Sequence, residues 1–116
     1  MTTMRRPQML DDEAFRCLRA GDTAGFGQSA GDRGEIDLSN TDLRGSDLRK
    51  FDLSRVVLRG AYLREANLRG QDLSNHDLAG CSLRNAKVAG VLFPDDLSPE
   101  EIQLSLEHGT RLRPRN

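Results

Sequence analysis

Residues 41–70 read TDLRGSDLRKFDLSRVVLRGAYLREANLRG, with a leucine at the third place of every group of five. The same period extends in both directions, so that ten consecutive leucines share one lattice. A helix would need apolar residues three and four apart and a flat strand would need alternation, so this period predicts a chain that turns regularly. The predicted core lattice comprises Leu38, Leu43, Leu48, Leu53, Leu58, Leu63, Leu68, Leu73, Leu78, Leu83, Val88 and Phe93.

The other places of each group also follow a pattern. The residue two before the leucine is mostly small or apolar, and the residue between them is usually Asp or Asn. Because side chains alternate between the two sides of an extended segment, the first and third of these three residues should point into the core and the middle one toward solvent. The last place is Gly or Asn in eight of twelve groups, which suits a tight corner. An extended piece and a corner, repeated, predict a coil whose turns stack at about 4.8 Å.

The groups TDLRG (41–45) and ANLRG (66–70) resemble the repeat of the pentapeptide-repeat proteins, whose consensus is A(D/N)LXX. The resemblance implies an all-β solenoid, a right-handed quadrilateral β-helix with four repeats per coil. Residues 36–95 would then form about three coils, capped by short N- and C-terminal α-helices. The stretch FPDDLSPEEIQLSLEHGTRLR (93–113) is similar to the ending of small proteobacterial members.

The N-terminal segment, residues 1–35, is expected to cap the first coil. A helix over about residues 11–20 would begin at a capping Asp11 or Asp12 and stop at Gly21. The glycine-rich stretch DTAGFGQSAG after it is expected to be a link, with Phe26 as an anchor.

The C-terminal segment, residues 96–116, is expected to cap the last coil. Ser98 is the expected N-cap, with Pro99 at the first helical position and Glu101 completing a capping box. The helix should run to about His108 and end at Gly109. A mobile, solubilising basic tail is expected after it, with Arg111, Arg113 and Arg115.

Composition places the chain among soluble single-domain proteins. It has 116 residues, 36% apolar and 30% charged, and a formal net charge of −1. No apolar run approaches the length of a membrane span, and no apolar signal-peptide region follows Arg5 and Arg6. Cys17 and Cys81 are far apart and form no CxxC pair, which favours reduced thiols in the cytoplasm. We therefore expect a cytoplasmic protein with no cofactor, no metal and no membrane partner.

Stacking every fourth repeat turns scattered charges into columns. Arg44, Arg64 and Arg84 fall in one column, an arginine ladder. The two adjacent faces that include it hold seven bases against three acids, a net of +4, whereas the opposite two faces hold two bases against five acids, a net of −3. The basic residues of the first pair of faces are Arg44, Arg49, Lys50, Arg64, Arg69, Arg84 and Lys87.

Two interpretations of this basic surface stay open. In the first, the arginines only keep the surface soluble and pair with nearby Asp; in the second, the ladder binds an anionic partner, including nucleic acid weakly. Val57 replaces an outward Asp one repeat before Tyr62, and these two residues are a candidate apolar contact.

Gln71 and His76 occupy inward places normally held by small residues, and a buried one would need a hydrogen-bond partner. The sequence contains no arrangement of residues that is typical of a catalytic site. His76 and Cys81 are expected on inward columns, and His108 has no identified acid or nucleophile beside it.

The sequence therefore predicts a non-enzymatic scaffold for an unidentified protein or other anionic partner. The resemblance adds a homodimer through the C-terminal end as a further expectation. It also implies an alternative, inhibition or protection of a type II topoisomerase (gyrase) by mimicry of DNA, which longer and more acidic relatives perform.

Overall fold

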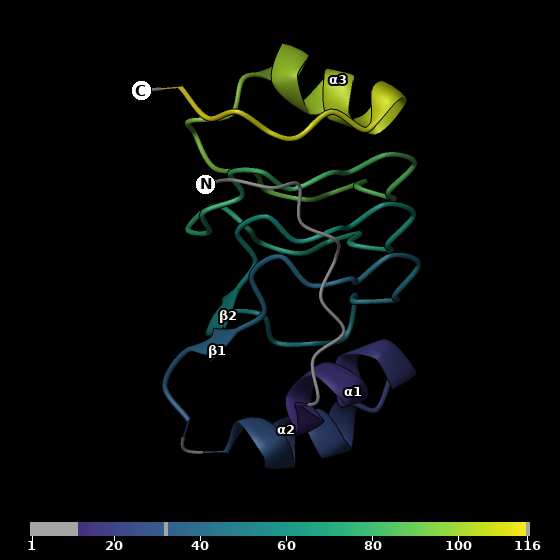
Figure 1. The fold of residues 1–116 in the computed structure, drawn as a ribbon, viewed down its shortest axis with the longest axis vertical. Helices are drawn as coiled ribbons and strands as arrows, with labels where there is room; N and C mark the ends of the chain where they lie inside the picture. Colours follow the sequence, from purple (N-terminus) through teal and green to yellow (C-terminus); the bar gives the residue numbers. More distant parts are fainter. Residues whose placement is uncertain (1–11, 32, 116) are drawn as a thin grey trace, which may run out of the picture.

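The computed structural model describes residues 12–31 and 33–115. Helices lie at both ends of the molecule, and stacked turns of the chain with little regular strand lie between them (Figure 1). Among these residues, no helix has the length and apolarity needed to cross a membrane. The elements are α1 (Glu13–Ala20), α2 (Thr23–Ala30), β1 (Ile36–Asp37), β2 (Val56–Val57) and α3 (Pro99–His108).

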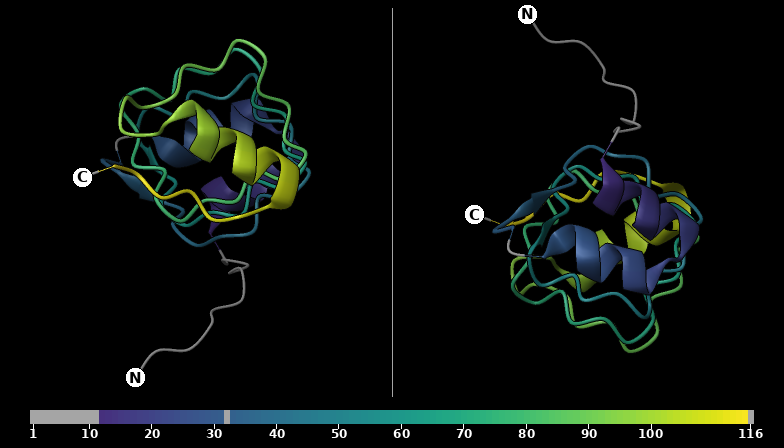
Figure 2. Two further views of the ribbon diagram at one scale, coloured as in Figure 1. Left: turned by 90° about the horizontal axis from the view of Figure 1, so that it is seen from above. Right: turned by 90° about the horizontal axis from the view of Figure 1, so that it is seen from below.

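The chain between the helices returns alongside itself after every 20 residues. Asp42 pairs with Tyr62, and Tyr62 pairs with Ser82, both in parallel. β1 and β2 pair in the same way, with Ile36 opposite Val56. Four groups of five residues therefore make one turn, and equivalent places of successive turns lie above one another. Figure 2 shows these turns in end view, with α3 across one end and α1 and α2 across the other.

Regular strand is much rarer than the expected β-helix implies. Within residues 12–31 and 33–115 it is confined to β1 and β2, each two residues long, and the remaining parallel contacts are isolated bridges. The reason is local: each extended piece is followed at once by a corner. At the corners Asn40, Gly45 and Gly70 have positive φ angles of 60°, 72° and 80°, a conformation that glycine and asparagine tolerate best.

The leucine lattice forms the core of the coil. The ten lattice leucines, Leu38 to Leu83, are each at most 2% exposed. Val88 and Phe93 are only partly buried and pack against this cluster from the last turn. Burial of a leucine side chain contributes roughly 1.5–3 kcal/mol, so this column is the main stabilising feature of the fold.

Helix α1 begins and ends as its sequence predicts. The Asp12 carboxylate accepts a hydrogen bond from the Phe15 amide at 3.2 Å, and Gly21 ends the helix in the left-handed conformation with φ of 76°. Its apolar side, with Phe15 and Leu18, is buried. Residue 11, the other cap candidate, lies outside the described residues.

The glycine-rich stretch is a helix, so the prediction of a link was wrong. Asp22 caps α2 by accepting a hydrogen bond from the Gly25 amide at 2.9 Å. Phe26 is the anchor that was expected: it is buried, and its ring meets the Phe51 ring edge-on with centroids 5.3 Å apart. A Cβ atom on Gly25 would collide with the capping Asp22 carboxylate and lie 2.9 Å from the Cys17 sulfur, so both the cap and the packing on α1 favour a glycine there. Tertiary contacts outweigh the low helix propensity of glycine.

Helix α3 covers the last turn. Ser98 accepts a hydrogen bond from the Glu101 amide at 3.1 Å, and Gly109 ends the helix with φ of 74°. Glu101 differs from the expected capping box, because its carboxylate accepts hydrogen bonds from the Arg113 backbone and guanidinium instead. Ser105 Oγ accepts a hydrogen bond from the Leu83 amide at 2.9 Å, which satisfies a donor at the coil's edge.

The basic tail is docked, so the prediction of a mobile end was wrong for residues 111–115. Leu112 is 2% exposed, and its amide and carbonyl pair with Cys81 and Gly80 at 2.8 Å. The Arg111 guanidinium lies 4.8 Å from the centre of the Tyr62 ring. The unpaired edge of the last turn supplies the backbone partners that hold this segment.

Candidate anion-binding face

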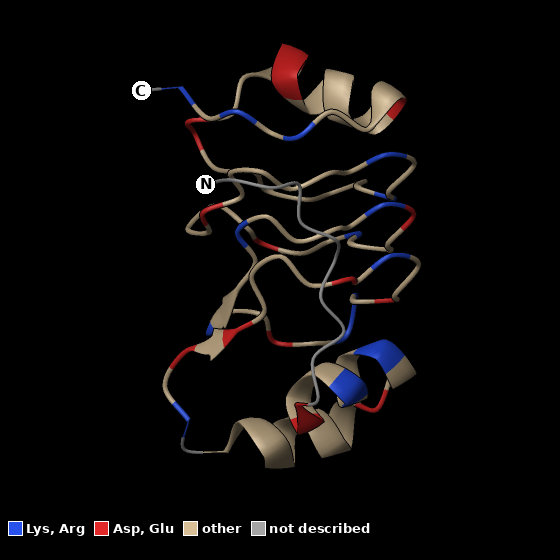
Figure 3. Ribbon diagram, viewed as in Figure 1, with Lys and Arg blue, Asp and Glu red and all other residues tan. Residues whose placement is uncertain are grey.

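The arginine ladder exists as a column because its backbone is paired across three turns. Asp42, Tyr62 and Ser82 form successive bridges, and Arg44, Arg64 and Arg84 each lie two residues further on. Figure 3 shows basic segments recurring one above another at this corner of the coil, with basic residues of α1 beneath them. The column thus presents guanidinium groups at the spacing of stacked turns.

Some basic side chains of these two faces are already paired within their own repeat. Arg44 contacts Asp42 through two hydrogen bonds of 2.8 and 2.7 Å, and Arg49 contacts Asp47 through two of 2.9 and 2.8 Å. Arg69 donates to the Asn67 side-chain oxygen at 3.1 Å. The shared cause is the spacing Asp/Asn-Leu-Arg, which puts an acceptor and a guanidinium side by side.

Ionisation strengthens these pairs. The hydrogen bond from Arg44 is the largest of the effects that lower the pKa of Asp42, and it outweighs the opposing effect of burial. The hydrogen bond from Arg49 lowers the pKa of Asp47 to about 2. Both carboxylates are therefore charged at neutral pH, and Arg44 and Arg49 are largely neutralised as partners for another molecule.

Arg64 and Arg84 differ from the other members. Neither guanidinium group forms a hydrogen bond or ion pair with any residue in the described ranges 12–31 and 33–115. The residue two before each is Tyr62 or Ser82, neither of which is an acid. Their charges are therefore available to an external anion.

These two arginines line an open hollow of about 560 Å³, which we call the basic hollow. Arg19 of α1 joins it from below, where its guanidinium donates to the Arg44 carbonyl at 2.8 Å. Gly109 lies beside the Arg64 guanidinium at the end of α3. Four arginines face two acids here, and the lining comprises Arg19, Asp42, Arg44, Gly45, Arg64, Glu65, Arg84 and Asn85.

Four of the predicted basic residues lie outside the basic hollow. Lys50 and Lys87 are exposed and do not line it, and neither do Arg49 and Arg69. Arg19 was missed, because nothing in the repeat pattern places α1 against this face. The distinction between Arg44 and Arg64 was also missed, although an Asp two residues before the arginine would have signalled it.

The structure does not bring Val57 and Tyr62 to one hollow. Tyr62 is half-buried and its ring lies under the Arg111 guanidinium. Val57 lines a different hollow, on the acidic side of the coil.

Gln71 and His76 reach carbonyl groups of the turn below. Gln71 Nε2 donates to the Leu48 and Phe51 carbonyls at 2.6 and 2.8 Å. His76 Nε2 lies 2.8 Å from the Leu53 carbonyl, so this nitrogen carries the proton.

Reactive groups are buried or isolated. Burial raises the pKa of Cys81 to about 12, and its thiol donates to the Leu58 carbonyl. Burial likewise raises the pKa of Cys17. His108 Nε2 lies 3.9 Å from the Glu107 carboxylate. In the part of the chain that the structure describes, no group of three or more His, Cys, Asp or Glu side chains is placed to hold a metal ion.

The repeat region matches a known protein family. Residues 36–75 and 61–93 match the family of pentapeptide repeats, in 8 copies. The two ranges together cover residues 36–93, half of the chain. No curated protein matches the chain.

Proposed function

The chain belongs to the pentapeptide-repeat family, and on that premise we propose that it is a non-enzymatic scaffold whose basic hollow binds an acidic group of a partner protein. Proteins of this family generally act as repeat scaffolds and often take part in protein interactions. The buried, weakly acidic thiols support a role without catalysis. The proposal places the chain in the cytoplasm, where Cys17 and Cys81 remain free thiols.

The proposal includes the family's architecture, a right-handed quadrilateral β-helix of about three coils between helical caps. The 20-residue return of the chain supports four repeats per coil. A rigid coil suits a scaffold, because it holds arginines in fixed positions before a partner arrives. Less conformational entropy is then lost on binding.

One observation carries the binding proposal: the guanidinium groups of Arg64 and Arg84 have no ion pair or hydrogen bond among the described residues. An acidic partner would gain charge-assisted hydrogen bonds from them without first breaking a pair in this chain. Arg44 and Arg49 would have to release Asp42 and Asp47 before they could do the same.

The test compares two double variants of equal charge. Arg64→Gln with Arg84→Gln removes the unpaired guanidinium groups, whereas Arg44→Gln with Arg49→Gln removes paired ones. Poly-glutamate serves as the protein-like anion, and its dissociation constant is measured by titration calorimetry over a salt series. Circular dichroism checks that both variants are folded.

We expect the first pair of changes to weaken poly-glutamate binding by roughly tenfold, and the second pair by much less. Increasing salt should weaken binding by the parent protein and reduce the difference in dissociation constant between the two variants. Equal losses in the two variants would mean that the whole basic surface acts only as a diffuse charge. Absence of parent binding at low salt would refute the proposal.

Binding of nucleic acid and mimicry of DNA remain alternatives. A short duplex in the same titration tests the first, with the two double variants as before. A gyrase supercoiling assay at micromolar protein tests the second. The basic hollow has the wrong sign for mimicry of DNA, so we expect no effect on supercoiling.

A homodimer through the C-terminal end is a second proposal, and it rests on exposed apolar side chains. Leu92 on the last turn is 57% exposed and Leu104 on α3 is 39% exposed. Large exposed apolar groups often mark contact surfaces. Light scattering after size exclusion should show a dimer in the parent and a monomer after Leu92→Asp with Leu104→Asp; a parent that is monomeric at high concentration would exclude it.

A further inference from the structure

The backbone pairing of the coil is interrupted in one place. Between residues 51–58 and 71–78, both inside the described range 33–115, no backbone–backbone hydrogen bond joins the two turns. On the basic faces the equivalent bonds are present, such as Tyr62 N to Thr41 O at 2.9 Å and Asn67 N to Ser46 O at 2.9 Å. The interruption spans two consecutive faces, those of the acidic side.

Gln71 and His76 occupy the interruption. By the pattern of the other faces, the Phe51 carbonyl should accept the Asp72 amide, but it accepts the Gln71 side chain instead. His76 Nε2 donates a hydrogen bond to the Leu53 carbonyl. The other ring nitrogen, Nδ1 of His76, is buried without a hydrogen-bond partner among the described residues. An unsatisfied buried acceptor costs about 1–3 kcal/mol. Residues that break the repeat pattern at a cost in stability are typical of functional sites.

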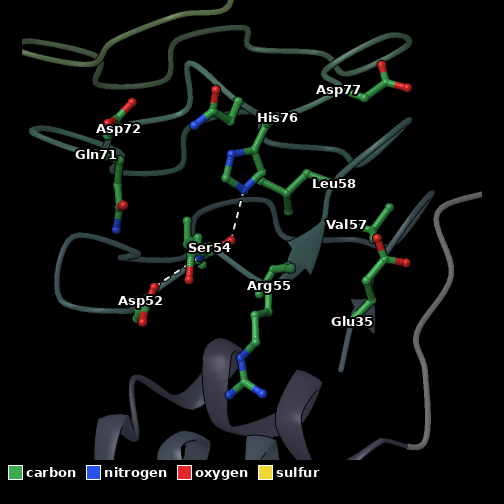
Figure 4. A pocket seen from close by; sticks show the side chains of 13 residues that line it. Glu35, Asp52, Ser54, Arg55, Val57, Leu58, Gln71, Asp72, His76 and Asp77 are labelled. Carbon is green, nitrogen blue, oxygen red and sulfur yellow. Dashed lines mark hydrogen bonds between the residues drawn. The ribbon is translucent and has the colours of Figure 1, made fainter. Parts of the chain in front are cut away.

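A hollow of about 660 Å³ opens at the interruption, and we call it the acidic hollow. Its size falls within the usual range for small-ligand sites. Figure 4 shows His76 at its centre, with Asp52, Asp72 and Gln71 to one side and Glu35, Val57 and Asp77 to the other.

Negative charge dominates the acidic hollow. Four carboxylates line it, and Arg55 is the one Lys or Arg among the lining residues. Arg55 is already engaged, because its guanidinium donates to the Gly31 and Arg33 carbonyls. Asp77 is paired with Arg59 at 2.7 Å. The other three acids, Glu35, Asp52 and Asp72, form no ion pair within residues 12–31 and 33–115.

Asp52 and Asp72 remain charged at neutral pH. Each accepts a hydrogen bond at 3.0 Å from the amide of the serine two residues on, Ser54 or Ser74. Hydrogen bonds from these serines are the main reason that the pKa values of both carboxyl groups are lowered. Arg55 also lowers the pKa of Asp52 and His76 that of Asp72, both by smaller electrostatic effects and without an ion pair among the described residues.

Part of the wall is apolar, formed by Leu53, Val56, Val57 and Leu58. We infer that the acidic hollow binds a guanidinium or ammonium group carried on a short aliphatic stem. The carboxylates attract the cation, and the apolar wall covers the stem. This inference is independent of the basic hollow, which lies on the other pair of faces and takes the opposite charge.

Two sources can present this chemistry: a free alkylguanidine or alkylamine, and an arginine or lysine side chain of a partner protein. The probe for the first is butylguanidinium, with butylurea as a neutral control of the same shape. The probe for the second is the capped peptide Ac-Gly-Arg-Gly-NH₂. Binding is followed by amide shifts of residues 52–58 and 71–77 in NMR titrations at low salt.

The variant for the test is Asp52→Asn with Asp72→Asn. Asparagine keeps the side-chain oxygen that accepts the serine amide, so the local turns should survive. Asp37→Asn is the matched control, because Asp37 accepts the Ser39 amide at the same 3.0 Å but does not line the hollow.

We expect butylguanidinium to bind and butylurea to bind at least about threefold more weakly. The double variant should lose at least about threefold in affinity for the cation, and Asp37→Asn less than about twofold. Peptide binding as tight as that of butylguanidinium would identify a protein side chain as the ligand, and binding of butylguanidinium alone would identify a free small molecule.

Equal affinity for butylurea, equal affinity of the double variant, or shifts confined to other residues would each overturn the inference. None of these results depends on poly-glutamate, so failure here leaves the proposal for the basic hollow intact.

Discussion

The basic and acidic sides of the coil share one leucine lattice but differ in how their turns are joined. On the basic side the inward residues are small, such as Ala61 and Ala66, and the backbone pairs from turn to turn. On the acidic side Gln71 and His76 interrupt that pairing between residues 51–58 and 71–78, and a hollow opens there. Where the backbone pairing is interrupted, the leucine column and the side chains of Gln71 and His76 join the two turns, and elsewhere the backbone pairing adds to the column.

The largest expected effect compares one core leucine from each side. Leu63→Ala, under the closed side, should lower the free energy of unfolding by about 3 kcal/mol, because the cavity is fully enclosed. Leu53→Ala should lower it by roughly 1 kcal/mol less, because Leu53 lines the acidic hollow and solvent can fill the space. Urea unfolding measures both. Equal decreases in the free energy of unfolding would show that the acidic hollow does not reduce the cost of a cavity at Leu53.

The next effect concerns the interruption itself. Gln71→Ala removes two hydrogen bonds to carbonyls and should cost about 1–2 kcal/mol. It also frees the Phe51 carbonyl for the Asp72 amide, so hydrogen exchange of Asp72 should slow. Asn67, already paired to Ser46, serves as the reference amide. Unchanged exchange at Asp72 would assign the interruption to His76 alone.

A smaller effect separates backbone strain from side-chain contact at the basic hollow. Gly21 and Gly109 both end helices in the left-handed conformation, with φ of 76° and 74°. Alanine at either position should cost about 1 kcal/mol through strain. Only at Gly109 would the new Cβ atom collide, at 2.7 Å from the Arg64 guanidinium. Gly109→Ala should therefore also alter poly-glutamate affinity, whereas Gly21→Ala should not.

The smallest effect is a pH dependence on the closed side. The pKa of Asp47 lies at about 2 in the folded chain, below its ordinary 3.8, because of Arg49. A lowered folded-state pKa stabilises the fold above the ordinary value, and that stabilisation is lost as pH falls toward 2. Asp47→Asn should flatten the fall of the unfolding free energy between these pH values. An unchanged slope would mean that the pair with Arg49 adds nothing to stability.

Features that depend on neighbours in sequence were predictable. The pentapeptide-repeat family is confirmed, since the period and the motif lie within groups of five residues. Helix α3 begins and ends where Ser98 and Gly109 predict, because capping is local.

Features that depend on distant contacts were not predictable. α2 forms because Gly25 fits against Cys17 and Phe26 reaches Phe51. Arg111 docks because Leu112 pairs with the edge at Gly80 and Cys81. For the same reason Arg19 could not be assigned to the basic hollow, nor Gln71 to an opening between turns.

The 20-residue return has a consequence for how such a gene can change in length. Insertion of a single repeat would keep every leucine in the lattice and every corner in place, so the product would still fold. Each residue after the insertion would move on by one face, however, and Arg84 would no longer stand above Arg64. Duplications in blocks of four repeats would lengthen both charged sides, whereas any other number would preserve the core and scramble the surface.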